Sequence, residues 1–188
     1  MVYFTSREIV AISMSAALWG VLNSIISPIF WTVTHLPFVC DLIGFTCLII
    51  AVWWTKKFGA ATAVGLIATI INFILRPTAI QFLAFLAASV LFDLTTRIVG
   101  YKTCFGNLKV RIISLIALSV LSGAFAGSII GLFLIAPGII SQMYGTVIPF
   151  ISLHALGGLL GGTLGFILIK AIESRSIQRP YSAIRAKT

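Results

Sequence analysis

Few side chains in this sequence could bind a solute or carry a proton, and most of them are predicted to lie at one set of helix ends. Asp41 is the most unusual of these residues, because it lies about one turn inside an apolar stretch without another charge. An ionisable group inside a membrane is costly, and it is retained where it has a partner or a function. His154 lies about two turns inside another apolar stretch, which is too deep for a residue of the membrane surface.

Seven further polar or aromatic residues occupy the same helix ends or the loops between them. They are Asn23, Trp31, His35, Asn72, Arg76, Gln81 and Tyr144. Polar groups that converge at one end of an apolar bundle are typical of a small-molecule pocket. A second interpretation stays open, in which Trp31 and Tyr144 are aromatic residues of the membrane interface and Asp41 only neutralises Arg76.

Motifs typical of enzymes are absent from the sequence. It has no Gly-x-Ser-x-Gly, no His-Glu-x-x-His, no phosphate-binding loop and no two carboxylates on one helix face. We therefore expect no catalytic residue, no cofactor and no metal centre; His35, Asp41 and His154 barely meet the needs of a metal site. The three cysteines lack metal-ligand spacing and are expected to be small packing residues. They are Cys40, Cys47 and Cys104.

The other three acids are expected at the opposite helix ends. Asp93 precedes Arg97 by four residues, a spacing that favours an ion pair within one helix. Glu8 and Glu173 lie among basic residues near the ends of the chain, where solvation is sufficient to explain them.

The elements that position these residues must be apolar helices. Of the 188 residues, 60% are hydrophobic and only 9% are charged, and the mean hydropathy is +1.14. About a quarter of the residues in a soluble domain are charged, so this chain cannot coat a water-facing surface. The net charge of +9 is spread through the gaps between apolar stretches and forms no basic face, so no nucleic-acid partner is expected.

Six apolar stretches are long enough to cross a hydrocarbon layer about 30 Å thick as helices. They cover about 9–30, 38–54, 58–75, 78–95, 110–136 and 146–169. Arg76-Pro77 separates the third from the fourth, because proline ends a helix at the residue before it. The predicted fold class is an all-α integral membrane protein, a bundle of six transmembrane helices. It forms a single domain, 1–188, that ends in a basic tail, 170–188.

The cations predict how this bundle is oriented. Twelve of the thirteen Lys and Arg residues lie in the terminal segments and in the connections after the second and fourth stretches, and only Arg76 lies in the other connections. Short cytoplasmic segments carry an excess of Lys and Arg. Both termini are therefore predicted to be cytoplasmic, in a multi-pass protein of the cell (plasma) membrane.

Small residues recur every fourth position in three stretches, a spacing that puts them on one helix face and lets helices approach closely. They are Gly123, Gly127 and Gly131 in the fifth stretch, Gly157, Gly161 and Gly165 in the sixth, and, as a weaker version, Ala16 and Gly20 in the first.

With this topology, the chain resembles the substrate-binding S-components of energy-coupling factor (ECF) transporters, which are small vitamin-capture proteins. The resemblance covers nearly the whole chain and rests on length, six helices, cytoplasmic ends and basic charge. Two segments add to it: Arg7-Glu8-Ile9-Val10-Ala11 leads into a first helix rich in small residues, and Lys56-Lys57-Phe58-Gly59-Ala60-Ala61 leads into the third.

The resemblance implies a function. An S-component binds a vitamin or vitamin precursor in its outer half, and it associates with a transmembrane coupling subunit and two cytoplasmic ATPases. The first helix of the family often docks through Ala-x-x-x-Ala, whose place Ala16 and Gly20 would take here. A thiamine-related pyrimidine is the favoured substrate. Thiamine itself, held through Asp41, and a carboxylate such as biotin or niacin, held through Arg76, stay open.

Other functions compete with this interpretation. A stand-alone secondary transporter or channel for a small solute would need a polar path through the inner half as well, where Asp93 is the main candidate. A membrane scaffold protein would use the glycine faces to bind another membrane protein. An integral membrane enzyme is the third alternative.

Overall fold

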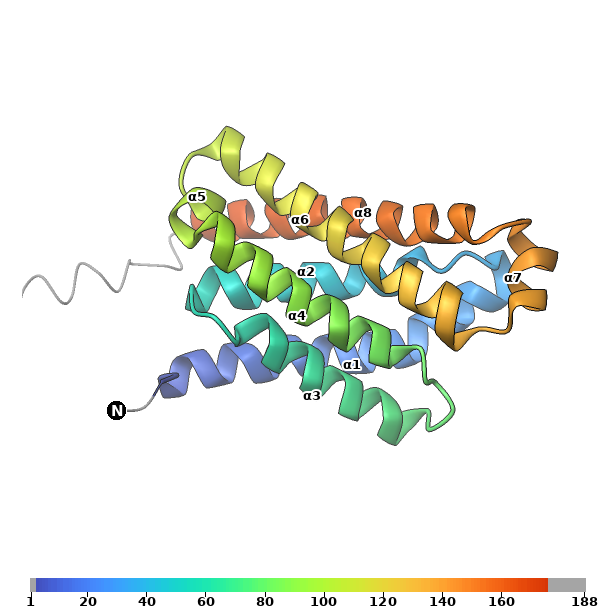
Figure 1. Cartoon of the computed structure of the whole chain (residues 1–188). Helices are drawn as coiled ribbons and strands as arrows, with labels where there is room; N and C mark the ends of the chain where they lie inside the picture. Colours follow the sequence, from blue (N-terminus) through green and yellow to red (C-terminus); the bar gives the residue numbers. More distant parts are fainter. Residues whose placement is uncertain (1–2, 176–188) are drawn as a thin grey trace, which may run out of the picture.

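The computed structural model describes residues 3–175, and this part of the chain folds into a helical bundle (Figure 1). In chain order the elements are α1 (Ser6–Thr34), α2 (Phe38–Thr55), α3 (Ala60–Leu75), α4 (Phe82–Val99), α5 (Tyr101–Phe105), α6 (Leu108–Ile129), the π-helical segment η1 (Ile130–Leu134), α7 (Pro137–Tyr144) and α8 (Val147–Ser174). The predicted tail, 170–188, begins within α8, and its part from residue 176 on lies outside the described residues.

Five of these helices are long and apolar enough to cross a membrane: α1, α2, α4, α6 with η1, and α8. The stretch predicted at 58–75 forms α3, which is apolar but has only 16 residues. At 1.5 Å per residue, α3 is about 24 Å long and falls short of a hydrocarbon layer of about 30 Å. The protein therefore has the architecture of a helical membrane protein, and α3 is the shortest of the helices that the six predicted stretches form.

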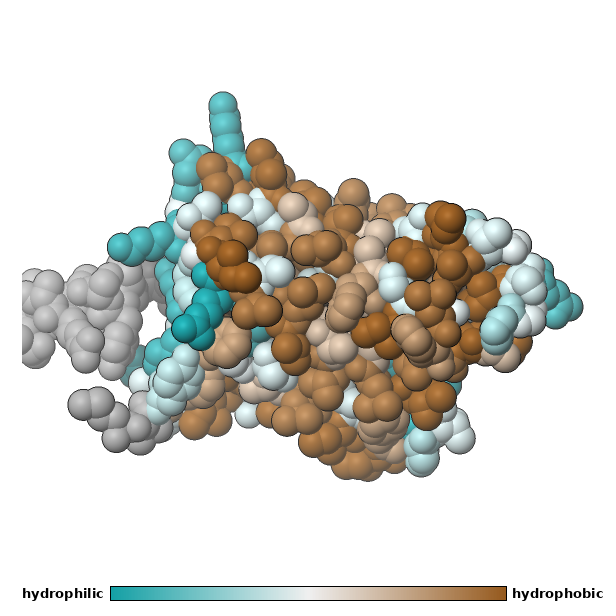
Figure 2. All heavy atoms as spheres, viewed as in Figure 1, coloured by the Kyte–Doolittle hydropathy of each residue, from teal (hydrophilic) through white to brown (hydrophobic). Residues whose placement is uncertain are grey.

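The long helices run side by side, and the beginning of α1 lies at the same end of the bundle as the end of α8 (Figure 1). α8 packs against α2 and α6, while α1 packs against α2 and α3. Brown, apolar side chains cover the middle of the surface in Figure 2, and teal, polar ones gather at both ends. This distribution is the one that a lipid layer around the middle of the bundle requires.

Local sequence signals explain several helix boundaries. Thr5 and Glu8 form a capping box, in which each side chain accepts a hydrogen bond from the other residue's backbone N–H, so α1 begins at Ser6. α3 ends at Leu75, before the Arg76-Pro77 break that was predicted there. The residues from 76 to 81 form turns, so α4 begins at Phe82, later than the predicted residue 78.

The glycines predicted to allow close helix contacts lie at such contacts. A Cβ atom on Gly161 would lie 2.8 Å from the Leu42 carbonyl oxygen of α2. A Cβ atom on Gly127 of α6 would lie 2.8 Å from the Cβ atom of His154 on α8. The glycine faces thus join α8 to both α2 and α6.

The small residues of α1 are also buried, which contradicts their predicted role as a docking surface. Ala16 is fully buried, and a Cβ atom on Gly20 would lie 2.7 Å from the side chain of Ile71 on α3. Both residues therefore pack inside the bundle, where another protein cannot reach them. The exposed side of α1 carries other residues, among them Ser13 and Ala17.

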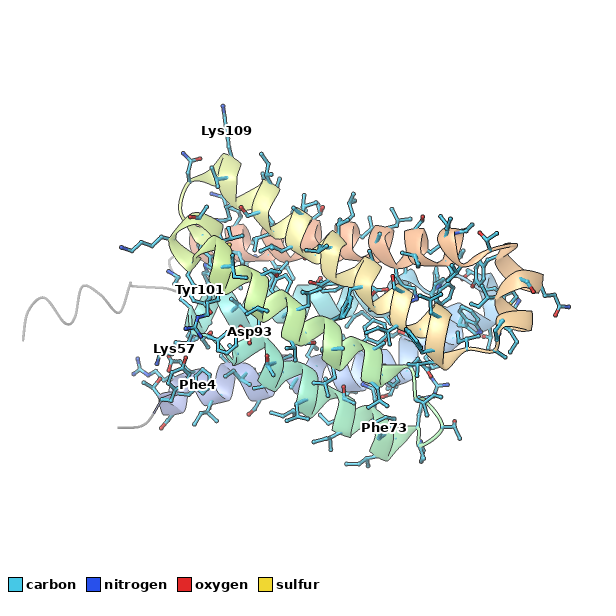
Figure 3. The ribbon with its side chains drawn as sticks, viewed as in Figure 1. Phe4, Lys57, Phe73, Asp93, Tyr101 and Lys109 are labelled. Atoms are coloured by element: carbon cyan, nitrogen blue, oxygen red, sulfur yellow. The ribbon has the colours of Figure 1, made fainter. Side chains whose placement is uncertain are left out.

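Asp93 does not pair with Arg97 as the spacing suggested. Its Oδ2 accepts hydrogen bonds from the backbone N–H and the hydroxyl of Thr62, at 3.0 and 2.9 Å, and so caps the start of α3. Arg97 lies over the ring of Phe58 instead, 4.8 Å from its centroid. Figure 3 shows Asp93 near Tyr101 and Lys57, at the end of the bundle where α1 begins.

The two terminal acids are paired rather than only solvated. Glu8 accepts a hydrogen bond from the Lys57 ammonium at 2.7 Å, which ties the start of α1 to the turn before α3. Glu173 on α8 accepts from the Arg111 guanidinium at 2.8 and 2.9 Å. Arg111 also donates to the Phe105 carbonyl at 2.6 Å, so one side chain joins α5, α6 and α8.

Candidate functional site

A cavity of about 340 Å³ opens among the helix ends opposite the one where α1 begins. This volume lies at the lower end of the range found for ligand sites, about 300–1,000 Å³. Its walls come from α1, the loop before α2, the first turn of α2, the α3–α4 connection, α4, η1 and α8. The lining residues are Ser27, Pro28, Trp31, Thr32, Leu36, Pro37, Val39, Cys40, Arg76, Gln81, Phe82, Phe85, Ile130, Ile135, Phe150 and His154.

Four of the nine predicted site residues line this cavity, and they come from three separate parts of the chain: α1, the α3–α4 connection and α8. They are Trp31, Arg76, Gln81 and His154. Arg76 contributes a permanent positive charge to the lining, and Gln81 contributes an amide that can donate and accept. The apolar part of the wall is largely aromatic, since it contains Trp31 together with phenylalanines of α4 and α8. Flat aromatic walls with a few polar groups suit a planar ligand.

Asp41 does not line the cavity but lies directly behind His154. Its Oδ2 is 2.6 Å from His154 Nδ1, and both side chains are essentially inaccessible to solvent. Asp41 therefore pairs with His154, 113 positions away along the chain, and not with Arg76 as the sequence suggested. Because Asp41 engages Nδ1, it fixes the orientation of a ring that lines the cavity.

Glycines make room for this pair between the helices. A Cβ atom on Gly157 would lie 2.7 Å from the Cβ atom of Asp41, and one on Gly127 would lie equally close to His154. The two interhelical glycine faces therefore do more than bring backbones together. They allow a carboxylate on α2 and an imidazole on α8 to meet inside the bundle.

Two predicted residues, Asn23 and Asn72, are buried beside the cavity and do not line it. Asn23 accepts a hydrogen bond from the hydroxyl of Ser27, which lies on the same helix and in the cavity wall. Asn72 on α3 accepts from the Ser24 hydroxyl of α1 at 2.9 Å, so it connects two helices through a polar contact. Both amides therefore support the wall without touching its contents.

His35 and Tyr144 also lie outside the cavity lining. Their contact is between the Tyr144 hydroxyl, which donates at 2.6 Å, and the His35 carbonyl oxygen. Burial raises the pKa of Tyr144, so the phenol keeps the proton that this bond needs. The Tyr144 ring packs edge-on against Phe150, a residue of the cavity wall, with centroids 5.2 Å apart. The prediction that these two side chains contact ligand is not supported by their positions.

Several lining residues were not predicted from the sequence. Ser27, Thr32, Cys40, Phe85 and Phe150 carry ordinary side chains for membrane helices, and nothing in their spacing separates them from lipid-facing neighbours. Two local irregularities mark the wall instead. Pro28 within α1 and the π-helical segment η1 both interrupt regular helix hydrogen bonding, and both contribute to the cavity lining.

The far side of the cavity is closed by packed core. Phe85 and His154 lie side by side at its floor, with ring centroids 6.0 Å apart. Phe45, Leu48 and Phe92 are essentially buried in the middle of the bundle. A solute in the cavity would therefore meet close-packed side chains rather than a continuous polar path.

Fold and site together define the class: a helical membrane protein with a solute-sized cavity at one end of its bundle. Compared with protein-family models, curated proteins and solved structures, the chain matches none.

Proposed function

We propose that the protein is the substrate-capture subunit of an ECF-type transporter, which binds a vitamin or vitamin precursor in the outer half of a cell membrane for ATP-driven uptake. One observation carries the proposal: the cavity of about 340 Å³ has aromatic walls, a few convergent polar groups and a closed floor. A capture protein needs a site that is accessible from one side and sealed towards the other. A channel needs an open path through the bundle, whereas Phe45 and Phe92 are buried in its middle.

The lining favours one chemical class of ligand. Trp31, Phe85 and Phe150 offer aromatic faces and edges for a planar ring, while His154 and Gln81 offer groups that pair with ring nitrogens. Arg76 favours a ligand that turns an acceptor oxygen towards it. A planar nitrogen heterocycle of vitamin size meets all three conditions. Thiamine-related pyrimidines are the first candidates, and carboxylate vitamins such as niacin and biotin are the second.

The proposal includes an orientation with six spans and cytoplasmic termini. The nine Lys and Arg residues from Arg7 to Arg175, other than Arg76, lie in the segments that Figure 1 places at the end where α1 begins. The cavity lies at the other end, so positive charge towards the cytoplasm turns the cavity outwards. Because α3 is short, its polar neighbours or a locally thinner bilayer must accommodate it. The two proposed ATPases would act from the cytoplasmic side, and the exposed side of α1 would be available to the proposed transmembrane coupling subunit.

Cysteine labelling tests this orientation. Gly138 in α7 is exposed with open space around it, and Lys109 at the opposite end points away from the bundle (Figure 3). In intact cells, Gly138→Cys is expected to react with a membrane-impermeant maleimide, and Lys109→Cys only after permeabilisation. The unmodified chain measures background from its native cysteines. The reverse pattern would overturn the orientation, and labelling of both variants from outside would overturn the even number of spans.

Ligand binding tests the function itself. Native mass spectrometry of the gently purified protein is expected to show a retained small molecule, and calorimetry with a panel of thiamine-related pyrimidines, niacin and biotin is expected to identify its class. Replacing Arg76 removes a charged hydrogen bond worth about 1.5–3 kcal/mol. Arg76→Gln should therefore lower affinity at least about ten-fold.

Arg97→Gln is the matched control, because it makes the same change at the other end of the bundle, where Arg97 lies over Phe58. Its affinity is expected to equal that of the unmodified protein. Equal losses in both variants would contradict the assignment of Arg76 to the site. A folded protein with no retained molecule and no response across the panel would contradict vitamin capture.

A further inference from the structure

Three potential metal ligands meet beside the cavity: Cys40 and His154, which line it, and Asp41, which lies behind His154. Each offers one ligand atom, and these atoms all lie within 4.8 Å of one another. Cys40 and Asp41 are consecutive in the first turn of α2, while His154 comes from α8. Two helices thus bring together a sulfur, a carboxylate and an imidazole. The spacing of these residues in the sequence does not match a known metal-binding motif, so the cluster is apparent only in the structure.

The cluster contains polar atoms with no protein partner. Asp41 Oδ1 and His154 Nε2 are both buried and make no hydrogen bond with any residue from 3 to 175. Leaving a buried polar group without a partner costs about 1–3 kcal/mol. An ion bound by the Asp41 carboxylate places a cation beside Oδ1 and so satisfies it. Because His154 also lines the cavity, an ion bound there remains reachable from the cavity.

We propose that Cys40, Asp41 and His154 bind one transition-metal ion of the Zn²⁺ or Co²⁺ type, with a further coordination position facing the cavity. A sulfur and an imidazole ligand select such ions, whereas Mg²⁺ and Ca²⁺ prefer oxygen ligands throughout. A thiolate and a carboxylate together balance a divalent charge, which makes the site neutral within an apolar bundle. The open position would take water or a donor atom of a solute in the cavity.

The ligand atoms, which lie within 4.8 Å of one another, must move by about 1 Å to form the site. His154 Nδ1 and Asp41 Oδ2 are 2.6 Å apart, within hydrogen-bond distance. The ion takes the place of the proton between them, and the neutral imidazole keeps its own proton on Nε2. Ligands of a tetrahedral ion with bonds of about 2.0–2.1 Å are about 3.3 Å apart, so this pair must open by well under 1 Å. The thiol of Cys40 donates to the Pro37 carbonyl at 2.6 Å, and rotation about its side-chain bond turns the sulfur away from that oxygen. The ion also replaces the thiol proton.

Cobalt is the probe for this site, because thiolate ligation to Co²⁺ gives a strong near-ultraviolet charge-transfer band. The full-length protein, purified in detergent and treated with a chelator, is expected to bind one Co²⁺ per chain and develop the band. Cys40→Ser should lose the band, and Asp41→Asn and His154→Gln should each lower affinity at least ten-fold. Cys47→Ser is the matched control, since it makes the same change seven residues along α2 and should bind as the unmodified protein does.

X-ray absorption of the unmodified protein loaded with Zn²⁺ gives an answer that does not depend on how the variants fold. One sulfur at about 2.3 Å with nitrogen or oxygen neighbours is expected. No sulfur, more than one sulfur, a band that survives Cys40→Ser, or the absence of stoichiometric binding below millimolar Co²⁺ would overturn the metal site. The vitamin panel repeated on chelator-treated protein keeps the two proposals apart. Vitamin binding without cobalt binding overturns only the metal site, and cobalt binding without vitamin binding overturns only vitamin capture.

Discussion

Replacing Asp41 by asparagine is expected to weaken binding of the captured ligand about ten-fold or more. The carboxylate holds His154 Nδ1 at 2.6 Å and thereby fixes the orientation of a ring that lines the cavity. An amide keeps the shape but loses the charge, and a charged hydrogen bond is about twice as strong as a neutral one. The expected loss is about 1–3 kcal/mol, the cost of leaving a buried polar group poorly paired. Calorimetry in detergent measures it.

Asp93 provides the matched control, because it is the other buried carboxylate of the bundle and lies at the opposite end. Asp93→Asn weakens the two hydrogen bonds that Asp93 accepts from Thr62 at the start of α3, so the melting temperature should fall. Ligand affinity should stay unchanged in the variant that remains folded. If Asp93→Asn lowered affinity as much as Asp41→Asn, the effect of Asp41 would be one of general stability rather than of the site.

Gly161→Leu is expected to prevent most of the protein from folding. A first side-chain atom at this position would already lie 2.8 Å from the Leu42 carbonyl oxygen and 3.0 Å from the Asp41 carbonyl oxygen. Backbone cannot move aside as a flexible side chain can, so α8 would have to separate from α2. Overpacking usually costs about 1–3 kcal/mol, and a leucine against backbone should exceed that range. Folded yield by size-exclusion chromatography and thermal unfolding measure the loss.

Gly138→Leu makes the same change in α7, where a Cβ atom meets nothing within 4 Å. Its folded yield and melting temperature should match those of the unmodified protein. A normal melting temperature for Gly161→Leu would show that α2 and α8 can separate at little cost. The close contact that places Asp41 beside His154 would then lose its explanation.

Hydropathy and charge were sufficient to predict the class of protein and most of its helices. Lipid imposes a single requirement over a whole span, about 20 apolar residues with their backbone groups paired internally, and such stretches are visible in one sequence. Five of the six predicted stretches form helices long enough to cross a membrane, and the remaining one, 58–75, forms the shorter α3. Two short helices, α5 and α7, were not predicted, because each has only eight residues or fewer.

The face that α1 turns towards the rest of the bundle was predicted wrongly. Ala16 and Gly20 were placed on a docking surface, yet both are buried against other helices. A helix surrounded partly by lipid and partly by protein is apolar on all sides, so hydrophobicity does not distinguish the two environments. Burial within the bundle had to be read from the structure.

For the residues of the site, too, the sequence predicted the depth in the bundle, whereas the tertiary structure decided the contacts. From the sequence alone, Trp31, Arg76, Gln81 and His154 could be placed near one end of the bundle, because polar groups in apolar stretches are few and each lies at a definite depth. Depth does not determine which side chains touch. Helix order and rotation brought His154 to Asp41, sent Asn23 and Asn72 into helix contacts, and added Cys40 to the cavity floor. Pairing depends on contacts between residues that lie far apart in the chain, and those contacts exist only after the helices pack.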